Sequence, residues 1–103
     1  MVLDLGKLED MKFQIGSTYF TNGVHSLVQE DKDFANFVAN SFKRHVNGDW
    51  GDLDKEDKAL NDMALESGED RLFSKYIYNG EVSIYIITEW DRSATTILFP
   101  EEY

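Results

Sequence analysis

Apolar residues recur at helical spacing most clearly after residue 30 of this chain. They follow the i, i+3, i+4, i+7 pattern that gives an α-helix one apolar face, at Phe34, Phe37, Val38, Ser41, Phe42 and His45. Asp31 and Asp33 suit the first turn of such a helix, and Lys43-Arg44-His45 suits the last, because of the helix dipole. The pattern predicts a helix that starts at Asp31 and stops at Asn47-Gly48.

A second helix is predicted further along the chain. Asp52 or Asp54 can cap its start, and Asp57 lies at a box-like spacing from Asp54. Ser67-Gly68 ends it. Its apolar stripe is thin and consists of Leu53, Leu60, Met63 and Ala64, with Glu56, Asp62 and Glu66 expected on the opposite side.

The last third of the chain has the composition of a sheet. Residues 71–78 and 82–90 are rich in aromatic and β-branched side chains, and Asn79-Gly80 between them predicts a two-residue type I′ turn. Residues 91–94 form a second predicted turn, and a third strand over 95–99 ends at Pro100. We expect an antiparallel meander whose middle strand is covered on both faces.

Period-two alternation also appears near the N-terminus. Phe13 and Ile15 alternate with polar residues as in a short strand, Gly16-Ser17 signals a turn, and Tyr19-Phe20-Thr21 suggests a second strand. These segments predict an N-terminal hairpin. Residues 1–11 are expected to form at most one turn of helix.

A short helix is expected between this hairpin and the Asp31 helix. Thr21 or Asn22 can cap it, and it stops near Gln29-Glu30. The predicted fold is therefore α+β: an antiparallel sheet, made of a C-terminal three-stranded meander plus an N-terminal hairpin, with two or three helices packed on one face. The 103 residues are expected to form one domain spanning 1–103.

Charge changes the picture of what this fold contacts. Twenty acids against ten bases give a formal net charge of −10, which repels nucleic acid and anionic lipid and favours basic protein surfaces. The same charge is also what keeps a small protein in solution. There is no cysteine, no signal-peptide pattern and no apolar run long enough to span a membrane, so we expect a cytoplasmic protein.

The acids concentrate between Asn47 and Asp70, where nine of the twenty acids meet only Lys55 and Lys58. A calcium-binding EF-hand loop does not fit this stretch. A loop starting at Asp52 has Asp57 where glycine is required, and one starting at Asn47 has Lys58 where glutamate is required. We therefore expect no metal and no cofactor, and a solvated acidic surface instead.

No pattern with a catalytic mechanism is present. His25 and His45 lack zinc-ligand spacing. Glu89 and Asp91 lie two residues apart at a strand end, but Arg92 beside them favours a structural turn pair. We assign no catalytic residues and expect a protein that is not an enzyme.

Trp50 lies between Asp49 and Gly51 in the segment that joins the two longer helices. A tryptophan in such a loop can anchor an interface with a partner. It can equally fill a gap in the core and hold the loop in place. The sequence leaves both alternatives open.

Three stretches resemble a known family. They are Phe20-Thr21-Asn22-Gly23-Val24, the segment Gly48-Asp49-Trp50-Gly51-Asp52-Leu53 continuing to Asn61-Asp62, and the long terminal run from Ile87-Thr88-Glu89-Trp90-Asp91-Arg92 to Pro100-Glu101-Glu102-Tyr103. The family consists of short proteins carried by bacterial plasmids, phages and other mobile elements. It includes an anti-CRISPR inhibitor of the type II RNA-guided nuclease from gut bacteria.

The resemblance implies a non-enzymatic anti-CRISPR inhibitor acting in the cytoplasm of the host bacterium. The apolar positions are few enough for one core, so we expect a monomer. Its partner would be a type II CRISPR effector nuclease, whose basic DNA-interacting surface an acidic surface can occupy without any nucleic acid being bound. In this interpretation Trp50 is the apolar anchor, and the phosphate surrogates are Asp49, Asp52, Asp54, Glu56 and Asp57.

Two alternatives stand beside it. The chain can be a mobile-element accessory protein of unknown activity that binds another protein partner. The acidic linker and the Asp91-Arg92 pair can also be residues that hold the fold, with a buried Asp–Arg pair orienting the last hairpin.

Overall fold

One mixed sheet organises the protein, with the strand order β1-β4-β3-β2. The computed structural model describes residues 11–103. The strands are β1 (Ser17–Phe20), β2 (Leu72–Ile77), β3 (Ser83–Thr88) and β4 (Ala94–Leu98). The helices are α1 (Asn22–Glu30), α2 (Lys32–Val46) and α3 (Lys55–Ser67), followed at the C-terminal end by the 3-10 turn η1 (Pro100–Glu102). The predicted α+β class is confirmed, whereas the helical turn expected in residues 1–11 lies outside the described residues, Met11 apart.

The C-terminal meander forms as predicted. β2 pairs antiparallel with β3 from Leu72↔Thr88 to Ile77↔Ser83, and β3 pairs antiparallel with β4 from Tyr85↔Leu98 to Thr88↔Thr95. Ile86 of β3 is fully buried on the helix side, and Ile87 is 7% exposed on the other. β3 thus contains a run of apolar residues because other side chains cover it on both faces of the sheet.

The predicted N-terminal hairpin is wrong. Residues 12–15 form no strand, and β1 pairs in parallel with β4, from Ser17↔Ala94 to Phe20↔Ile97. Phe13 and Ile15 are instead partly buried side chains, each packed against a different part of the core. The alternating pattern correctly predicted that these two side chains face the core. It carries no information about which distant strand pairs with this part of the chain.

The predicted type I′ turn at Asn79-Gly80 is also wrong. That turn needs positive φ at both central residues, and neither Asn79 nor Gly80 has it. The Val82 N–H donates to the Asn79 carbonyl (3.3 Å) and to the Asn79 side-chain oxygen (3.1 Å). The Asn79 side chain therefore supports a turn that is shifted by one residue, with Gly80 and Glu81 as its central positions.

The helix ends follow the sequence closely. The Asp31 carboxylate accepts from the Phe34 N–H (3.1 Å) to cap α2, and the Asp54 carboxylate accepts from the Asp57 N–H (2.8 Å) to cap α3. Gly68 ends α3 in the left-handed conformation at φ 71°. Thr21 precedes α1 without a side-chain cap, because its hydroxyl donates to Glu102 (2.6 Å).

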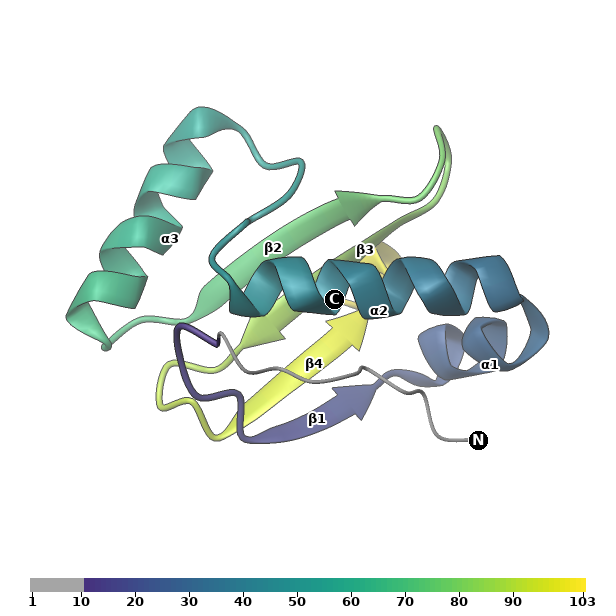
Figure 1. Ribbon diagram of the computed structural model, residues 1–103, viewed down its shortest axis with the longest axis horizontal. Coiled ribbons are helices and arrows are strands. Elements are labelled where there is room, and N and C mark those ends of the chain that lie inside the picture. Colours follow the sequence, from purple (N-terminus) through teal and green to yellow (C-terminus); the bar gives the residue numbers. More distant parts are fainter. Residues whose placement is uncertain (1–10) are drawn as a thin grey trace.

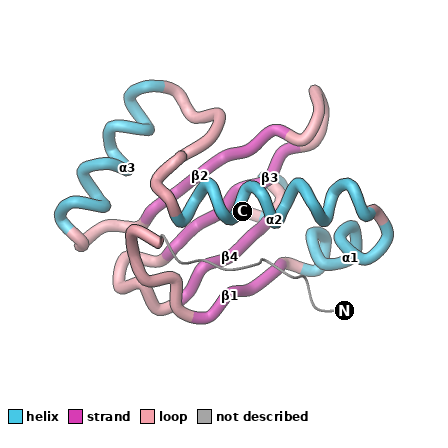
Figure 2. Tube along the Cα trace, in the orientation of Figure 1, coloured by secondary structure: helices cyan, strands magenta, loops and turns pink. Residues whose placement is uncertain are grey.

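The helices are placed differently with respect to the sheet. α2 crosses one face, α1 lies beside it at the β1 side, and α3 stands next to the edge strand β2 (Figure 1, Figure 2). The main core lies between α1, α2 and the sheet, and its buried members are Val24, Val28, Phe34, Ala35, Val38, Phe42, Val46, Tyr76, Ile84, Ile86 and Ile97. A smaller cluster of Trp50, Ala64 and Leu72 attaches α3.

The apolar stripe predicted for α3 is wrong in half of its members. Leu60 and Met63 are 62% and 65% exposed, whereas Asn61 and Ala64 are buried against the rest of the protein. The helix packs through one small apolar residue and one amide, which a hydrophobic pattern does not reveal. Leu60 and Met63 are left on its outer side.

Candidate functional site

The acidic linker between α2 and α3 is part of the sheet. Gly51 forms a parallel bridge with Lys75 of β2, the Asp52 N–H donates to the Lys75 carbonyl (2.7 Å), and the Lys75 N–H donates to the Trp50 carbonyl (3.3 Å). Gly51 has φ 78°, and a Cβ there would lie 2.0 Å from the Lys75 oxygen. Glycine is required at this position, because residues 50–52 act as a fragment of a fifth strand.

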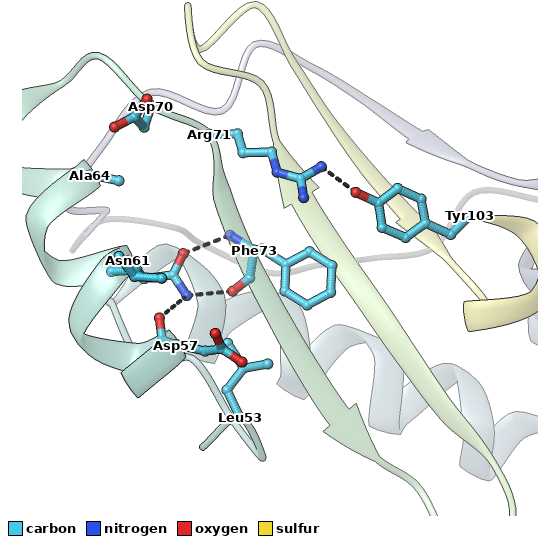
Figure 3. Close-up of a pocket in the computed structure, with 9 residues that line it drawn as sticks. Leu53, Asp57, Asn61, Ala64, Asp70, Arg71, Phe73 and Tyr103 are labelled. Atoms are coloured by element: carbon cyan, nitrogen blue, oxygen red, sulfur yellow. Dashed lines mark hydrogen bonds between the residues drawn. The ribbon is translucent and has the colours of Figure 1, made fainter. Parts of the chain in front are cut away.

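Side chains complete this protection of the β2 edge. The Asn61 amide oxygen accepts from the Phe73 N–H (2.8 Å), and its NH₂ group donates to the Phe73 carbonyl (2.7 Å), as Figure 3 shows. The Asp52 carboxylate accepts from the Ile77 N–H (2.9 Å). Backbone groups that an edge strand would otherwise offer to another chain are thus occupied within the protein.

Asp49 is held in place by several neighbours. The Arg44 guanidinium donates two hydrogen bonds to its carboxylate (2.7 and 3.2 Å), and the Gly51 N–H donates a third (3.1 Å). The hydrogen bond from Arg44 holds the pKa of Asp49 below its usual range. The Tyr76 hydroxyl also donates to the Asp49 carbonyl (2.6 Å). Asp49 therefore shapes the start of the linker.

Trp50 is a core residue, which is the second of the two alternatives that the sequence left open. It is 3% exposed, its ring lies 6.2 Å from that of Phe13 and 5.7 Å from that of His45, and its indole N–H donates to Asp62 (2.8 Å). The expected apolar anchor is therefore not available at the surface. Trp50 fills the space between the linker, α2 and α3.

The remaining linker acids differ in whether their carboxylates accept a hydrogen bond. Asp52 and Asp54 are exposed, but each accepts one backbone N–H, from Ile77 and Asp57 respectively. Glu56 and Asp57 are exposed, and their carboxylates form no hydrogen bond or ion pair with any described residue. Of the six residues predicted to bind a partner, these are the two whose carboxylates have no bonding partner within residues 11–103.

A groove lies between α3 and the face of the sheet that α1 and α2 do not cover (Figure 3). Its volume is about 480 Å³, and its lining is Leu53, Asp57, Leu60, Asn61, Ala64, Asp70, Arg71, Phe73 and Tyr103. The Arg71 guanidinium donates to the Tyr103 hydroxyl and lies 5.7 Å from the centre of the Phe73 ring. The groove therefore combines apolar walls with two carboxylates and one arginine held against aromatic rings.

His45 and Ser74 form a Ser–His pair, but it is closed to solvent. His45 Nδ1 lies 2.6 Å from Ser74 Oγ, and Nε2 lies 3.0 Å from Thr88 Oγ1. All three side chains are fully buried. Burial lowers the pKa of His45 to about 3, so the ring stays neutral and ties α2 to β2 and β3.

The buried Asp91–Arg92 pair suggested by the sequence is not formed. Asp91 is exposed, and its carboxylate accepts from the Ser93 N–H (3.0 Å). Arg92 Nη1 donates to the carbonyls of Asp70 (2.6 Å), Glu89 and Trp90, and Nη2 donates to the Ala64 carbonyl (3.2 Å). Arg92 does hold the last hairpin, but through carbonyl groups at the end of α3 rather than through its acidic neighbour.

Trp90 is the exposed tryptophan of this protein, with 62% of its surface accessible. It was not singled out from the sequence as a binding residue. Its flanking acids Glu89 and Asp91, where the predicted strand 82–90 meets the predicted turn 91–94, were the signal that it lies at the surface. The importance of Asn61 had no comparable signal, because an amide in a helix is ordinarily solvated.

Within residues 11–103, no three His, Asp or Glu side chains lie close enough together to hold a metal ion. None of the helices in that range has the length and apolar composition to cross a membrane. No protein-family model, no curated protein and no solved structure matches this chain. A function for this protein is therefore inferred from the chemistry of its surface.

Proposed function

We propose that this protein is a non-enzymatic inhibitor that binds a basic, DNA-interacting surface of a type II RNA-guided nuclease through the side of α3 that carries Glu56, Leu60 and Met63. One observation carries the proposal: a carboxylate that bonds to no described residue and exposed apolar side chains share that side. Glu56, Leu60 and Met63 follow at helical spacings of four and three, and all three are exposed. The resemblance to mobile-element proteins supplies the identity of the partner.

The composition of this side suits a basic protein surface better than nucleic acid. Its carboxylates repel phosphates, while Leu60 and Met63 supply the apolar contact that Trp50 does not provide. A nuclease of this class holds DNA in positively charged channels. A protein bound there excludes DNA by occupying the same surface, and its approach is steered by charge.

Some of the linker acids stabilise the fold, so substituting them does not test binding alone. Asp49 is engaged by Arg44 and Gly51, and Asp54 caps α3. Changing either of these residues alters the structure as well as the surface charge. The test therefore uses Glu56, Asp57 and Glu66, which are exposed on α3 and whose carboxylates bond to no described residue.

The experiment is DNA cleavage by a guide-loaded type II effector, with the protein added before or after target DNA. The unaltered protein is expected to inhibit only when it is added first. The combined variant Glu56→Lys, Asp57→Lys and Glu66→Lys is expected to lose inhibition by roughly tenfold or more, and each tenfold corresponds to about 1.4 kcal/mol. Higher salt is expected to weaken inhibition.

The matched control is the combined variant Glu30→Lys, Asp33→Lys and Glu81→Lys. These acids are also exposed, lie away from α3, and change the net charge by the same amount. Asp33 lies in the first turn of α2, as Glu56 and Asp57 do in α3, so the control also includes a charge reversal that opposes a helix dipole. Equal loss in both variants would reject the α3 side, and no inhibition by the unaltered protein would reject the inhibitor function itself.

A further inference from the structure

The turn between β3 and β4 displays Trp90 to solvent. Trp90 is 62% exposed, so a large apolar ring lies in water. Trp90 is not part of the lining of the groove at α3 and β2. It therefore marks a second surface, next to the C-terminal end of α3.

The backbone of this turn is held in an unusual conformation. Arg92 has φ 61°, the one positive φ among the described residues that are not glycine. Its four hydrogen bonds to carbonyl groups, described above, and the Arg92 N–H bond to the Glu89 carbonyl (2.9 Å) maintain that conformation. Because strained backbone persists only where its surroundings enforce it, the turn is fixed before any partner arrives.

A recess of about 390 Å³ adjoins the indole. Its lining is Gly68, Glu69, Trp90, Asp91 and Arg92. Arg92 Nη1 donates to the carbonyls of Asp70, Glu89 and Trp90, and Nη2 donates to that of Ala64, so both terminal nitrogens of the guanidinium are engaged. Glu69 and Asp91 contribute carboxylates, and among the described residues the one hydrogen bond to them is that of the Ser93 N–H to Asp91. Because two carboxylates outweigh the single guanidinium of Arg92, the recess offers an aromatic face and a net negative charge.

We propose that this recess receives an arginine side chain of a protein partner, with the guanidinium stacked on Trp90 and its N–H groups donating to Glu69 and Asp91. An arginine fits better than a lysine, because its planar group stacks on an aromatic ring and binds carboxylates with two parallel hydrogen bonds. The inference rests on the proposed function only for the identity of that partner. The chemistry of the recess is testable without the nuclease.

The first experiment follows the two indole N–H resonances by NMR while a blocked Ala-Arg-Ala tripeptide is added. The Trp90→Phe variant assigns the Trp90 signal by removing it. The Trp90 signal is expected to move in a saturable way. The Trp50 signal is expected to stay, because its N–H is bonded to Asp62 and its ring is buried.

The Ala-Lys-Ala tripeptide is the matched control for charge, and it is expected to move the Trp90 signal less. Replacing both acids, by Glu69→Gln and Asp91→Asn, is expected to weaken arginine binding by roughly threefold to tenfold, as for exposed ion pairs. An unmoved Trp90 signal, equal effects of arginine and lysine, or equal shifts of both indoles would each overturn the proposal.

The second experiment connects the recess to the nuclease. Trp90→Ala is expected to weaken inhibition by roughly tenfold or more, as at an interface hot spot, while the unfolding temperature stays near that of the unaltered protein. Tyr19→Ala, which removes a ring that is 56% exposed on β1, is the control and is expected to have no effect.

The two failures are distinguishable. Inhibition by the unaltered protein that survives Trp90→Ala would overturn the role of Trp90 while leaving the proposed function in place. Absence of inhibition together with arginine-selective binding at Trp90 would overturn the nuclease as partner, and the recess would stand on the NMR result.

Discussion

At several points of this protein, side chains form hydrogen bonds that backbone groups or water would otherwise form. His45 is the most enclosed of these side chains. Its two ring nitrogens contact Ser74 and Thr88, whose hydroxyl lies 2.8 Å from that of Thr95. The Thr95 hydroxyl donates to the Ile15 carbonyl (2.8 Å). One buried polar chain therefore links α2, three strands and the segment before β1, and its burial favours a neutral imidazole.

The pH dependence of stability follows from this burial. The pKa of His45 falls from 6.5 to about 3 on folding, so between these values the unfolded chain binds more protons. The contribution of neutral His45 is complete above pH 6.5 and is lost as pH falls toward 3, with a slope of up to about 1.4 kcal/mol per pH unit. Chemical unfolding of the unaltered protein and of His45→Gln at several pH values measures this. The stability advantage of the unaltered protein is expected to shrink on acidification, and a constant difference would contradict the assignment.

Trp50 and Asp62 give a second prediction at this scale. Asp62→Ala removes the acceptor of the buried indole N–H and is expected to cost about 1–3 kcal/mol in the free energy of unfolding. Asp62→Asn keeps an oxygen acceptor and is expected to cost much less. Urea unfolding compares the two, and equal costs would mean that the hydrogen bond contributes nothing beyond the charge.

At the scale of elements, the edge of β2 is the most informative feature. Its outward backbone groups are occupied by the linker at Lys75, by Asp52 at Ile77 and by the Asn61 amide at Phe73. A helix beside an edge strand ordinarily covers it with apolar side chains. In α3 the contact is instead made by an amide that has the donor and acceptor of a strand residue.

Asn61→Ala tests this arrangement. The variant leaves the Phe73 N–H and carbonyl without partners and is expected to lower stability by about 2 kcal/mol, with increased self-association at high concentration. Asn61→Asp retains an acceptor for the Phe73 N–H and is expected to be intermediate. Thermal unfolding and light scattering measure the two effects. Unaltered stability in Asn61→Ala would show that water replaces the amide without cost.

At the scale of the whole molecule, charge acts against compactness. The formal net charge is −10, and the described chain measures 38 × 27 × 22 Å. At low ionic strength the Debye length exceeds most of these distances, so acids repel one another across the protein.

The unfolding temperature is therefore expected to rise when NaCl is increased from about 0.01 M to about 0.1 M, which shortens the Debye length from about 30 Å to about 10 Å. Calorimetry at fixed pH is the measurement. A fall in unfolding temperature would mean that attractive pairs such as Arg44–Asp49 outweigh the general repulsion. The same salt change weakens binding to a basic partner, so stability and inhibition are expected to move in opposite directions.

Local signals in the sequence predicted local structure well. The caps at Asp31 and Asp54, the stop at Gly68 and the C-terminal meander were predictable, because each depends on residues close together in the chain. The pairing of β1 with β4 was not, since it joins residues nearly eighty positions apart. For the same reason the sequence did not distinguish buried Trp50 from exposed Trp90. Their surroundings come from segments that only the fold brings together.

The parallel pairing of β1 with β4 also bears on how the protein is made. β1 emerges from the ribosome well before the residues that pair with it, Ala94 to Ile97, which lie nearly eighty positions further along the chain. Glu102, which accepts from Thr21 and from the Gly23 N–H at the start of α1, follows later still. The sheet therefore closes only after β4 and η1 have been synthesised. Until then the nascent chain holds α1 and α2 without the strands that cover their apolar faces, so these faces are exposed to chaperones and proteases.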